Sequence, residues 1–315
     1  MGLAVGWSIG ANDAANSLGT AVGCKVLTLK QAIVLIAVCG FIGAILQGSH
    51  VAKTIGKGIV PMDQLDKDLA LYVALVSCFA ACAWVVIATY WKMPISTSHS
   101  IVGAVAGAGF AIHAPVKIKL LADIFTCWIL TPLGAAFFGF ILYFIFKNIF
   151  YRIVPRRYVR NVLIALVVIS GCYVAYTWGA NDVANATGVM VGAGIFSANI
   201  SISLGALAIV IGIMTWGYKV IETVGSEITN LLPLMAFSAQ LASAVNVHIY
   251  TMFGIPVSTS HSIVGAIFGV GLVKGAHFLN IKIMKDIILC WLATPFISGV
   301  ISFIVLKGIM FFVKM

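Results

Sequence analysis

Two polar, glycine-punctuated motifs each occur twice in a chain of 315 residues that is otherwise strongly apolar. The first, Gly-Ala-Asn-Asp-x-Ala-Asn, begins at Gly10 and returns at Gly179. The second, Pro-x-Ser-Thr-Ser-His-Ser-Ile-Val-Gly-Ala, begins at Pro94 and returns at Pro256. Polar helix interruptions at matching points of two apolar repeats are typical of secondary transporters, where they build one site near the middle of the bilayer. The repetition therefore predicts two similar halves around a shared site.

The composition places this chain in a membrane. Charged residues make up 9% of it and hydrophobic residues 62%, whereas soluble domains carry roughly 25% charged residues. The apolar runs are long and do not alternate with polar residues, which favours transmembrane helices over membrane strands. We expect an all-α polytopic membrane protein with two internal repeats, broken helices and re-entrant hairpins.

The same order of segments is expected in both halves, which we place at residues 1–151 and 161–315, with a basic linker at 152–160. Each half has a helix with the Asn/Asp motif, an apolar helix, a polar elbow, another helix, the Ser/Thr motif and a long last helix. The segments 102–114 and 264–276 are barely long enough to cross, so they are candidate re-entrant arms. The number of crossings per half stays open.

Positive charge is concentrated between the halves. The net charge is +10, and the positive-inside rule places such cations in cytoplasmic loops. We therefore expect a multi-pass plasma-membrane protein with a cytoplasmic linker, whose partner is the lipid bilayer and not nucleic acid. The densest cluster consists of Lys147, Arg152, Arg156, Arg157 and Arg160.

The seven cysteines form no Cys-x-x-Cys pair and no cluster with histidine, so they are read as small apolar residues and not as metal ligands. We expect no cofactor. No cleavable signal peptide is evident at the N-terminus. The first Asn/Asp motif follows only nine residues, whereas its copy follows an apolar run at 162–178. The first helix is therefore expected to be short or to begin upstream of the given start.

The Asn/Asp motif predicts a polar cavity within the bilayer, because a carboxylate there costs about 3 kcal/mol or more unless it has a partner. Several oxygens on one helix turn suit Na⁺, which also accepts backbone carbonyls of an unwound turn, and the flanking glycines permit unwinding. Alternatively, the asparagines simply bridge helices. The candidate cation-coupling residues are Asn12, Asn16, Asn181 and Asn185, and the candidate Na⁺ ligands are Asp13, Asn16, Asp182 and Asn185.

The Ser/Thr motif predicts the start of a helix. Its proline breaks or opens a helix, and its hydroxyls are of the kind that cap one. Free amides at a helix N-terminus bind anions, so two such ends facing each other would surround an oxyanion. The alternative is ordinary capping. The candidate anion-binding residues are Asp13, Asp182, Ser96, Thr97, Ser98, Ser258, Thr259 and Ser260.

Two further features of this site carry alternatives. His99 and His261 either hydrogen-bond their own helix neighbours or take part in proton coupling or gating. An Asp beside an anion is reasonable if Na⁺ lies between them or if the anion itself donates a proton. Phosphate near neutral pH carries such a proton and sulfate does not, so a direct contact with Asp13 or Asp182 would favour phosphate.

At these motifs the chain resembles the inorganic phosphate transporter (PiT) family of cation-coupled phosphate permeases. Residues 179–186 are similar to the family signature and residues 10–17 to its partner. The resemblance spans both halves and implies inverted-topology repeats, a central phosphate site and coupling to Na⁺ or H⁺. Glu222 matches a family glutamate tied to transport, but the corresponding first-half position is Lys53. This departure argues against symmetric cation coupling, and Lys53 is a candidate to pair with an acid or with the anion.

The leading hypothesis is a symporter that imports inorganic phosphate by alternating access. The nearest alternative is a permease of the same architecture for sulfate or another tetrahedral oxyanion. An intramembrane hydrolase is disfavoured, because no Gly-x-Ser-x-Gly elbow is present and the histidines are adjacent to the serines. An anion channel is the third alternative. The sequence leaves open whether Na⁺ or H⁺ is coupled and whether a homo-oligomer forms.

Overall fold

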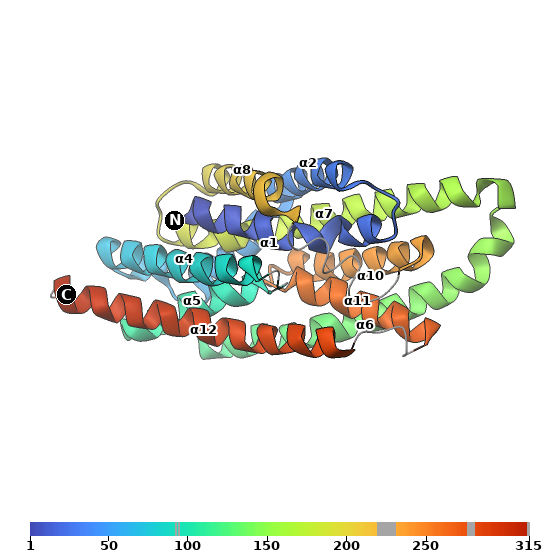
Figure 1. Cartoon of the computed structure of the whole chain (residues 1–315). Helices are drawn as coiled ribbons and strands as arrows, with labels where there is room; N and C mark the ends of the chain where they lie inside the picture. The colour runs from blue at the N-terminus through green and yellow to red at the C-terminus, as the bar shows by residue number, and fades with distance from the viewer. Residues whose placement is uncertain (92, 94, 219–230, 276–280, 314–315) are drawn as a thin grey trace.

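The computed structural model describes all residues except 92, 94, 219–230, 276–280 and 314–315, and the described residues form helices without strands (Figure 1). The α-helices of the first half are α1 (Gly2–Gly23), α2 (Leu29–Gln47), α3 (Ser49–Lys53), α4 (Lys67–Tyr90), α5 (Thr97–Ala111) and α6 (Ile118–Ile153). Those of the second half are α7 (Val159–Gly192), α8 (Ala198–Trp216), α10 (Pro233–Met252), α11 (Thr259–Lys274) and α12 (Ile281–Val313). A π-helical turn, η1 (Thr54–Gly58), continues α3, and short 3₁₀ turns lie at η2 (Met62–Gln64) and η3 (Arg156–Tyr158).

Local sequence fixes several helix starts. Thr28 and Gln31 form a reciprocal capping box at α2, which satisfies two amides that a helix start leaves without partners. Asp66 caps α4. Ser96 and Ser258 cap α5 and α11 in the same way, because each hydroxyl accepts the amide three residues later. The Ser/Thr motif therefore begins a helix in both halves, as its residue types predict.

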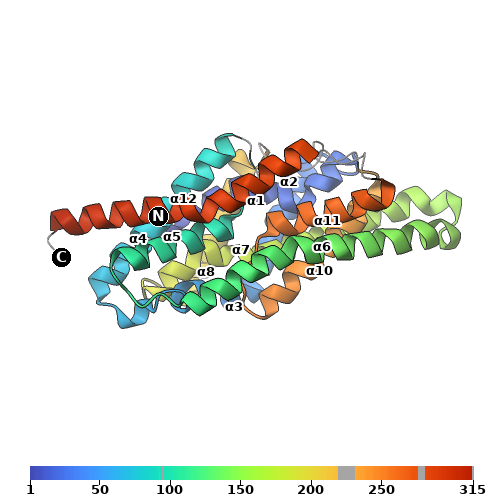
Figure 2. The same cartoon turned by 90° about the horizontal axis from the view of Figure 1, so that it is seen from below.

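The helices of the two halves are interleaved. Helix α1 packs against α8, and its counterpart α7 packs against α2. Likewise α5 packs against α12, and α11 against α6. Figures 1 and 2 show α4 and α5 toward one end of the molecule and α10 and α11 toward the other, with α6 and α12 running along one face. The order of elements matches the predicted repeats, whereas the boundaries at 151 and 161 remain a prediction.

Glycines let the interleaved helices approach closely. A Cβ on Gly103 or Gly107 of α5 would overlap backbone atoms of Pro295 and Gly299 in α12. The same holds for Gly265 and Gly269 of α11, which lie on the backbone of α6 at residues 132 and 136. Small residues at such a four-residue spacing are the usual basis of close helix contacts in membranes. These contacts hold each short helix against a long helix of the other half.

The outside of the bundle is suited to lipid. Within the described residues, six helical segments are long and apolar enough to cross a membrane, in α2, α4, α6, α7 with its preceding turn, α8 and α12. Large apolar side chains such as Phe137 and Phe296 are exposed on α6 and α12. Helices α5 and α11 have 15 and 16 residues, about 23 Å of helix, which is less than the roughly 30 Å of a hydrocarbon core. The chain is an integral membrane protein in which two helices, α5 and α11, are shorter than the hydrocarbon core is thick.

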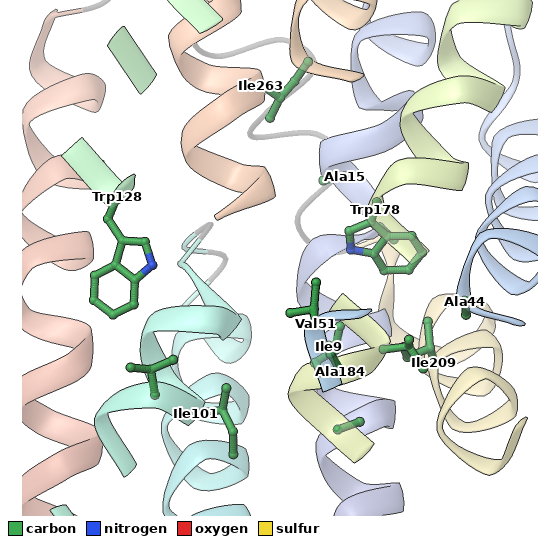
Figure 3. Close-up of a cluster of buried hydrophobic side chains, with 14 of the residues drawn as sticks. Ile9, Ala15, Ala44, Val51, Ile101, Trp128, Trp178, Ala184, Ile209 and Ile263 are labelled. Atoms are coloured by element: carbon green, nitrogen blue, oxygen red, sulfur yellow. The ribbon is translucent and has the colours of Figure 1, made fainter. Parts of the chain in front are cut away.

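Buried apolar side chains surround the middle of the bundle. In Figure 3, Trp128 of α6 and Ile101 of α5 lie on one side of the cluster, and Trp178, Ile9 and Ile209 lie on the other. All five side chains are at most 4% exposed. This packing makes the surroundings of the central polar residues dry and rigid.

One expectation about the backbone was wrong. The Asn/Asp motifs lie inside unbroken helices, in α1 and in α7, and show no unwound turn. Their glycines serve close packing instead, because a Cβ on Gly10 would overlap the backbone of Ile209 and one on Gly179 that of Gly40. The breaks lie ahead of the Ser/Thr motifs, since α4 ends at Tyr90 and α10 ends at Met252. Helix α1 has 22 residues and α7 has 34.

Candidate substrate and cation site

The two Asn/Asp motifs and the two Ser/Thr motifs meet at one place. Helices α1 and α7 contact each other, and the first turns of α5 and α11 meet them there. Every candidate side chain of the two Asn/Asp motifs is at most 1% exposed, and the Ser/Thr hydroxyl residues are at most 4% exposed. A buried polar cluster of this kind is stable only when its groups are paired.

Asp13 accepts hydrogen bonds from both halves. Its Oδ2 accepts the Thr97 hydroxyl at 2.7 Å. Its Oδ1 accepts the side-chain amide of Asn16 at 3.1 Å and lies 3.3 Å from the Ser260 hydroxyl. Because Ser260 belongs to the second half, this carboxylate joins α1 to the starts of both short helices.

Asp182 repeats the arrangement from the second half. Its Oδ2 accepts the Thr259 hydroxyl at 2.9 Å, and its Oδ1 accepts the amide of Asn185 at 3.2 Å. The two carboxylates thus hold the second hydroxyl residue of each Ser/Thr motif in the same manner. The pairing links α7 to α11, as Asp13 links α1 to α5.

Asn16 and Asn185 connect the halves reciprocally. Asn16 donates to the Ser260 hydroxyl at 2.8 Å, and Asn185 donates to the Ser98 hydroxyl at 3.0 Å. The amide oxygen of each has no hydrogen-bond partner among the described residues. Two buried, unpaired oxygens next to two carboxylates form a donor set that suits Na⁺, a hard cation that prefers oxygen ligands.

Asn12 and Asn181 have a different place. Asn12 donates to the Thr89 hydroxyl at 2.9 Å and accepts the Ile95 amide at 3.3 Å. Asn181 donates to the Thr251 hydroxyl at 2.9 Å and to the Ile255 carbonyl at 3.3 Å. Both side chains therefore tie the end of α4 or α10 to the segment that follows it. The Asn181 amide oxygen, like those of Asn16 and Asn185, has no hydrogen-bond partner among the described residues.

The serines of the Ser/Thr motifs divide into two kinds. Ser98 donates to the Val257 carbonyl at 2.9 Å, and Ser260 donates to the Ile95 carbonyl at 2.8 Å. These hydroxyls therefore meet the other half directly. Ser96 and Ser258 instead cap their helices, each accepting a backbone amide at 3.1 Å.

The electrostatics of the site favour an anion together with cations. The first amides of α5 and α11 have no carbonyl within their own helix to donate to, and each helix start carries about half a positive charge. Two ionised aspartates outweigh this before any anion arrives. The buried polar residues that the structure describes include no Lys or Arg. With both aspartates ionised, an oxyanion at this place would need cations or protons as counter-charges.

The remaining candidates lie around this cluster or outside it. His99 and His261 are buried, and their Nδ1 atoms face the backbone carbonyls of Trp291 and Trp128 rather than their own helix neighbours. Lys53 is exposed at the end of α3 and is not brought into the cluster. Glu222 lies outside the described residues.

Sequence reasoning missed several groups that complete the site. Thr89 and Thr251 bind the asparagines next to the aspartates, and their signal is that each lies five residues before the proline of a Ser/Thr motif. The carbonyls of Ile95 and Val257 accept the motif serines, and a backbone carbonyl leaves no signal in a sequence. The tryptophans do carry a signal, because Trp-x-x-Thr-Pro occurs in both α6 and α12.

Known phosphate transporters resemble this chain in sequence and in fold. The profile of the family described as "Phosphate transporter family" matches residues 9–302. A candidate phosphate permease from Pyrococcus abyssi is 33% identical, covering 98% of this chain and 96% of that protein. The chloroplastic inorganic phosphate transporter 2-1 of Arabidopsis thaliana is 28% identical, covering 93% of this chain and 68% of that protein.

A solved structure, "The sodium-dependent phosphate transporter", superposes with a TM-score of 0.89 at 28% identity, covering 98% of this chain and 97% of that one. The family profile and the fold therefore agree over nearly the full length of the chain. The chain belongs to the phosphate transporter family.

Proposed function

We propose that this protein imports inorganic phosphate across the plasma membrane by Na⁺ symport with alternating access. The observation that carries the proposal is the central cluster. Two helix starts with their hydroxyls supply donors for an oxyanion, while Asp13, Asp182 and the unpaired oxygens of Asn16 and Asn185 supply ligands for cations. Both sets lie within hydrogen-bond distance of each other. Binding of the anion and of the cation is therefore coupled by charge.

The unpaired amide oxygens support Na⁺ over H⁺ as the coupled ion. An asparagine oxygen is not a proton acceptor near neutral pH, but it is a good ligand for a metal cation. Two such oxygens beside two carboxylates cannot carry a proton themselves, so they contribute little to a proton relay. The similar solved structure is described as sodium-dependent, which is in line with this choice.

The arrangement of the helices supports alternating access. The α4–α5 and α10–α11 pairs lie toward opposite ends of the molecule (Figure 1), and a helix break separates the two helices of each pair. Inverted repeats of this kind can rock around a fixed site and expose it to one side at a time. The exposed basic residues of the α6–α7 connection support a cytoplasmic location for that connection.

The test is uptake of radiolabelled phosphate by the purified full chain in liposomes. Three conditions separate the possibilities: an inward Na⁺ gradient at equal pH, an inward proton gradient without Na⁺, and neither. The double variant Asp13→Asn with Asp182→Asn sets the background. We expect saturable uptake only with the Na⁺ gradient, and little effect of a hundredfold excess of sulfate.

Each other result has a definite meaning. Uptake driven by pH alone would refute Na⁺ coupling. Strong competition by sulfate would assign the wider oxyanion class to the site. Flux that needs no gradient and does not saturate would indicate a channel.

A further inference from the structure

The duplicated Trp-x-x-Thr-Pro motif has no place in the proposed transport site, yet it lies directly behind it. It occupies residues 128–132 of α6 and 291–295 of α12, and both helices continue through the proline. In an α-helix each carbonyl accepts the amide four residues later. Pro132 and Pro295 have no amide hydrogen, so the carbonyls of Trp128 and Trp291 lose their helical partners. In a membrane interior such a freed carbonyl needs another donor.

That donor is the histidine of the Ser/Thr motif from the other half of the chain. His261 Nδ1 lies 3.3 Å from the Trp128 carbonyl oxygen, and His99 Nδ1 lies 3.2 Å from the Trp291 carbonyl oxygen. Because a carbonyl can only accept, each imidazole carries its proton on Nδ1 and donates it. Both histidines are 4% exposed. Each histidine therefore replaces a helical hydrogen bond that is missing because of a proline 120 or more residues away in the chain.

Ring contacts join the two bonds into one unit. The imidazole of His99 stacks on the indole of Trp128 with centroids 3.6 Å apart, and His261 lies 3.7 Å from Trp291 in the same measure. The two imidazoles are themselves 4.4 Å apart, edge to face. We call this group of two histidines and two tryptophans the clasp. The Trp128 indole also donates to the Pro256 carbonyl at 3.1 Å, which fixes the segment that leads into α11.

The clasp holds the part of each short helix that faces the transport site. His99 is the third residue of α5, directly after Thr97 and Ser98, whose hydroxyls reach Asp13 and the other half. The glycine contacts with α12 begin only at Gly103, more than one turn further along. Without the histidine bond, the first turn of α5 would be anchored mainly by the groups that bind substrate.

We propose that His99 and His261 are positioning residues that set the spacing of the oxyanion cage. Each uses its Nδ1–H to fix the first turn of a short helix to a carbonyl that a proline has released in a long helix of the other half. This rests on the proposed function, because it assigns the cage to an oxyanion. The role of each proline is to leave a backbone carbonyl available as an acceptor. The duplicated Trp-x-x-Thr-Pro and Ser/Thr motifs then supply the two sides of the same hydrogen bond.

The bond is tested first without any substrate. Pro132→Ala restores an amide that competes for the Trp128 carbonyl, so His261→Ala should cost less thermal stability in that background than in the parent. The control pair, Pro132→Ala with Thr28→Ala, should be additive, because Thr28 caps α2 and belongs to no part of the clasp. Additivity of both pairs in detergent-solubilised protein would overturn the clasp.

The second test asks whether the bond positions the cage. His99→Ala should raise the phosphate KM about fivefold, the loss expected for one hydrogen bond, with kcat reduced less. His99→Asn, whose amide can donate from nearly the same place, should recover most of the affinity. Ser100→Ala is the matched control on α5, since it removes a buried hydrogen bond to the Ala81 carbonyl on another face; it should lower stability and leave KM unchanged.

The two tests separate failure of this inference from failure of the proposed function. A parent protein that takes up no phosphate refutes the transport proposal, while the stability cycle still decides whether the clasp exists. An active parent in which His99→Ala leaves KM unchanged, despite a coupled stability cycle, shows a bond that only stabilises the fold and overturns the positioning role.

Discussion

Neutralising a single carboxylate should greatly raise the Na⁺ concentration that phosphate uptake requires. Asp182→Asn keeps the shape of the side chain and leaves an oxygen to accept the Thr259 hydroxyl, which lies 2.9 Å away in the parent. It removes one negative charge next to the unpaired Asn185 oxygen. A cation about 4 Å from a carboxylate gains roughly 4 kcal/mol from it at the effective dielectric constant of about 20 that describes even buried protein sites. Loss of that attraction corresponds to about a thousandfold weaker binding of Na⁺.

The fold should survive this change. The new amide group faces Asn185 Nδ2, which donates to Asp182 Oδ1 at 3.2 Å in the parent, so one hydrogen bond is lost at a cost of about 1–3 kcal/mol. The assay is the initial rate of phosphate uptake as a function of Na⁺ concentration, beside the thermal midpoint of the purified variant. Asp123→Asn, on the exposed surface of α6, is the matched control and should behave as the parent does.

The direction of the effect decides between two roles for the carboxylate. If Asp182 recruits a cation, the variant needs far more Na⁺ and binds phosphate more weakly at physiological Na⁺. If Asp182 only repels the anion, removing its charge strengthens phosphate binding. A half-saturating Na⁺ concentration within threefold of the parent value would refute the cation role.

Three further changes test other parts of the structure. Ser98→Ala combined with Ser260→Ala should raise the phosphate KM about fivefold for each hydroxyl, and unaltered uptake kinetics would reduce these hydroxyls to helix structure. Gly179→Val should destabilise the protein by about 1–3 kcal/mol through overlap with the α2 backbone, measured by thermal unfolding beside Gly308→Ala, whose Cβ would meet no atom within 4 Å. Arg157→Cys should react with a membrane-impermeant thiol reagent from the cytoplasmic side only; labelling from outside would reverse the proposed topology.

Much of the site could be predicted because its residues are costly in a membrane. A carboxylate such as Asp13 in an apolar segment has few explanations other than a partnered cavity. The same reasoning applied twice to the Ser/Thr motif predicted two facing helix starts, and the bonds from Ser98 and Ser260 to the opposite half confirm that they meet. Because each motif occurs twice, a single sequence was enough to predict that two similar half-sites face each other.

The errors and omissions have a physical cause as well. A glycine beside a polar residue suits both an unwound turn and close helix packing, and these two uses leave the same letters in a sequence. Gly10 and Gly179 serve the second use. Hydrogen bonds between residues far apart in the chain could not be predicted from the sequence either. The bond of His99 to the Trp291 carbonyl is one example, because it depends on how α5 packs against α12.

Each half of the site is completed by the other, and this explains why the motifs come in pairs. Asn16 donates to Ser260 and Asn185 donates to Ser98, so neither half holds a full set of ligands alone. In a transporter with inverted repeats, exchanging the conformations of the halves would preserve the same bonds with their roles swapped, so inward-facing and outward-facing states can differ little in energy. The symmetry is not complete, since Lys53 stands where the second half has Glu222. Matching substitutions in the two halves should therefore affect transport in the same direction but to different degrees.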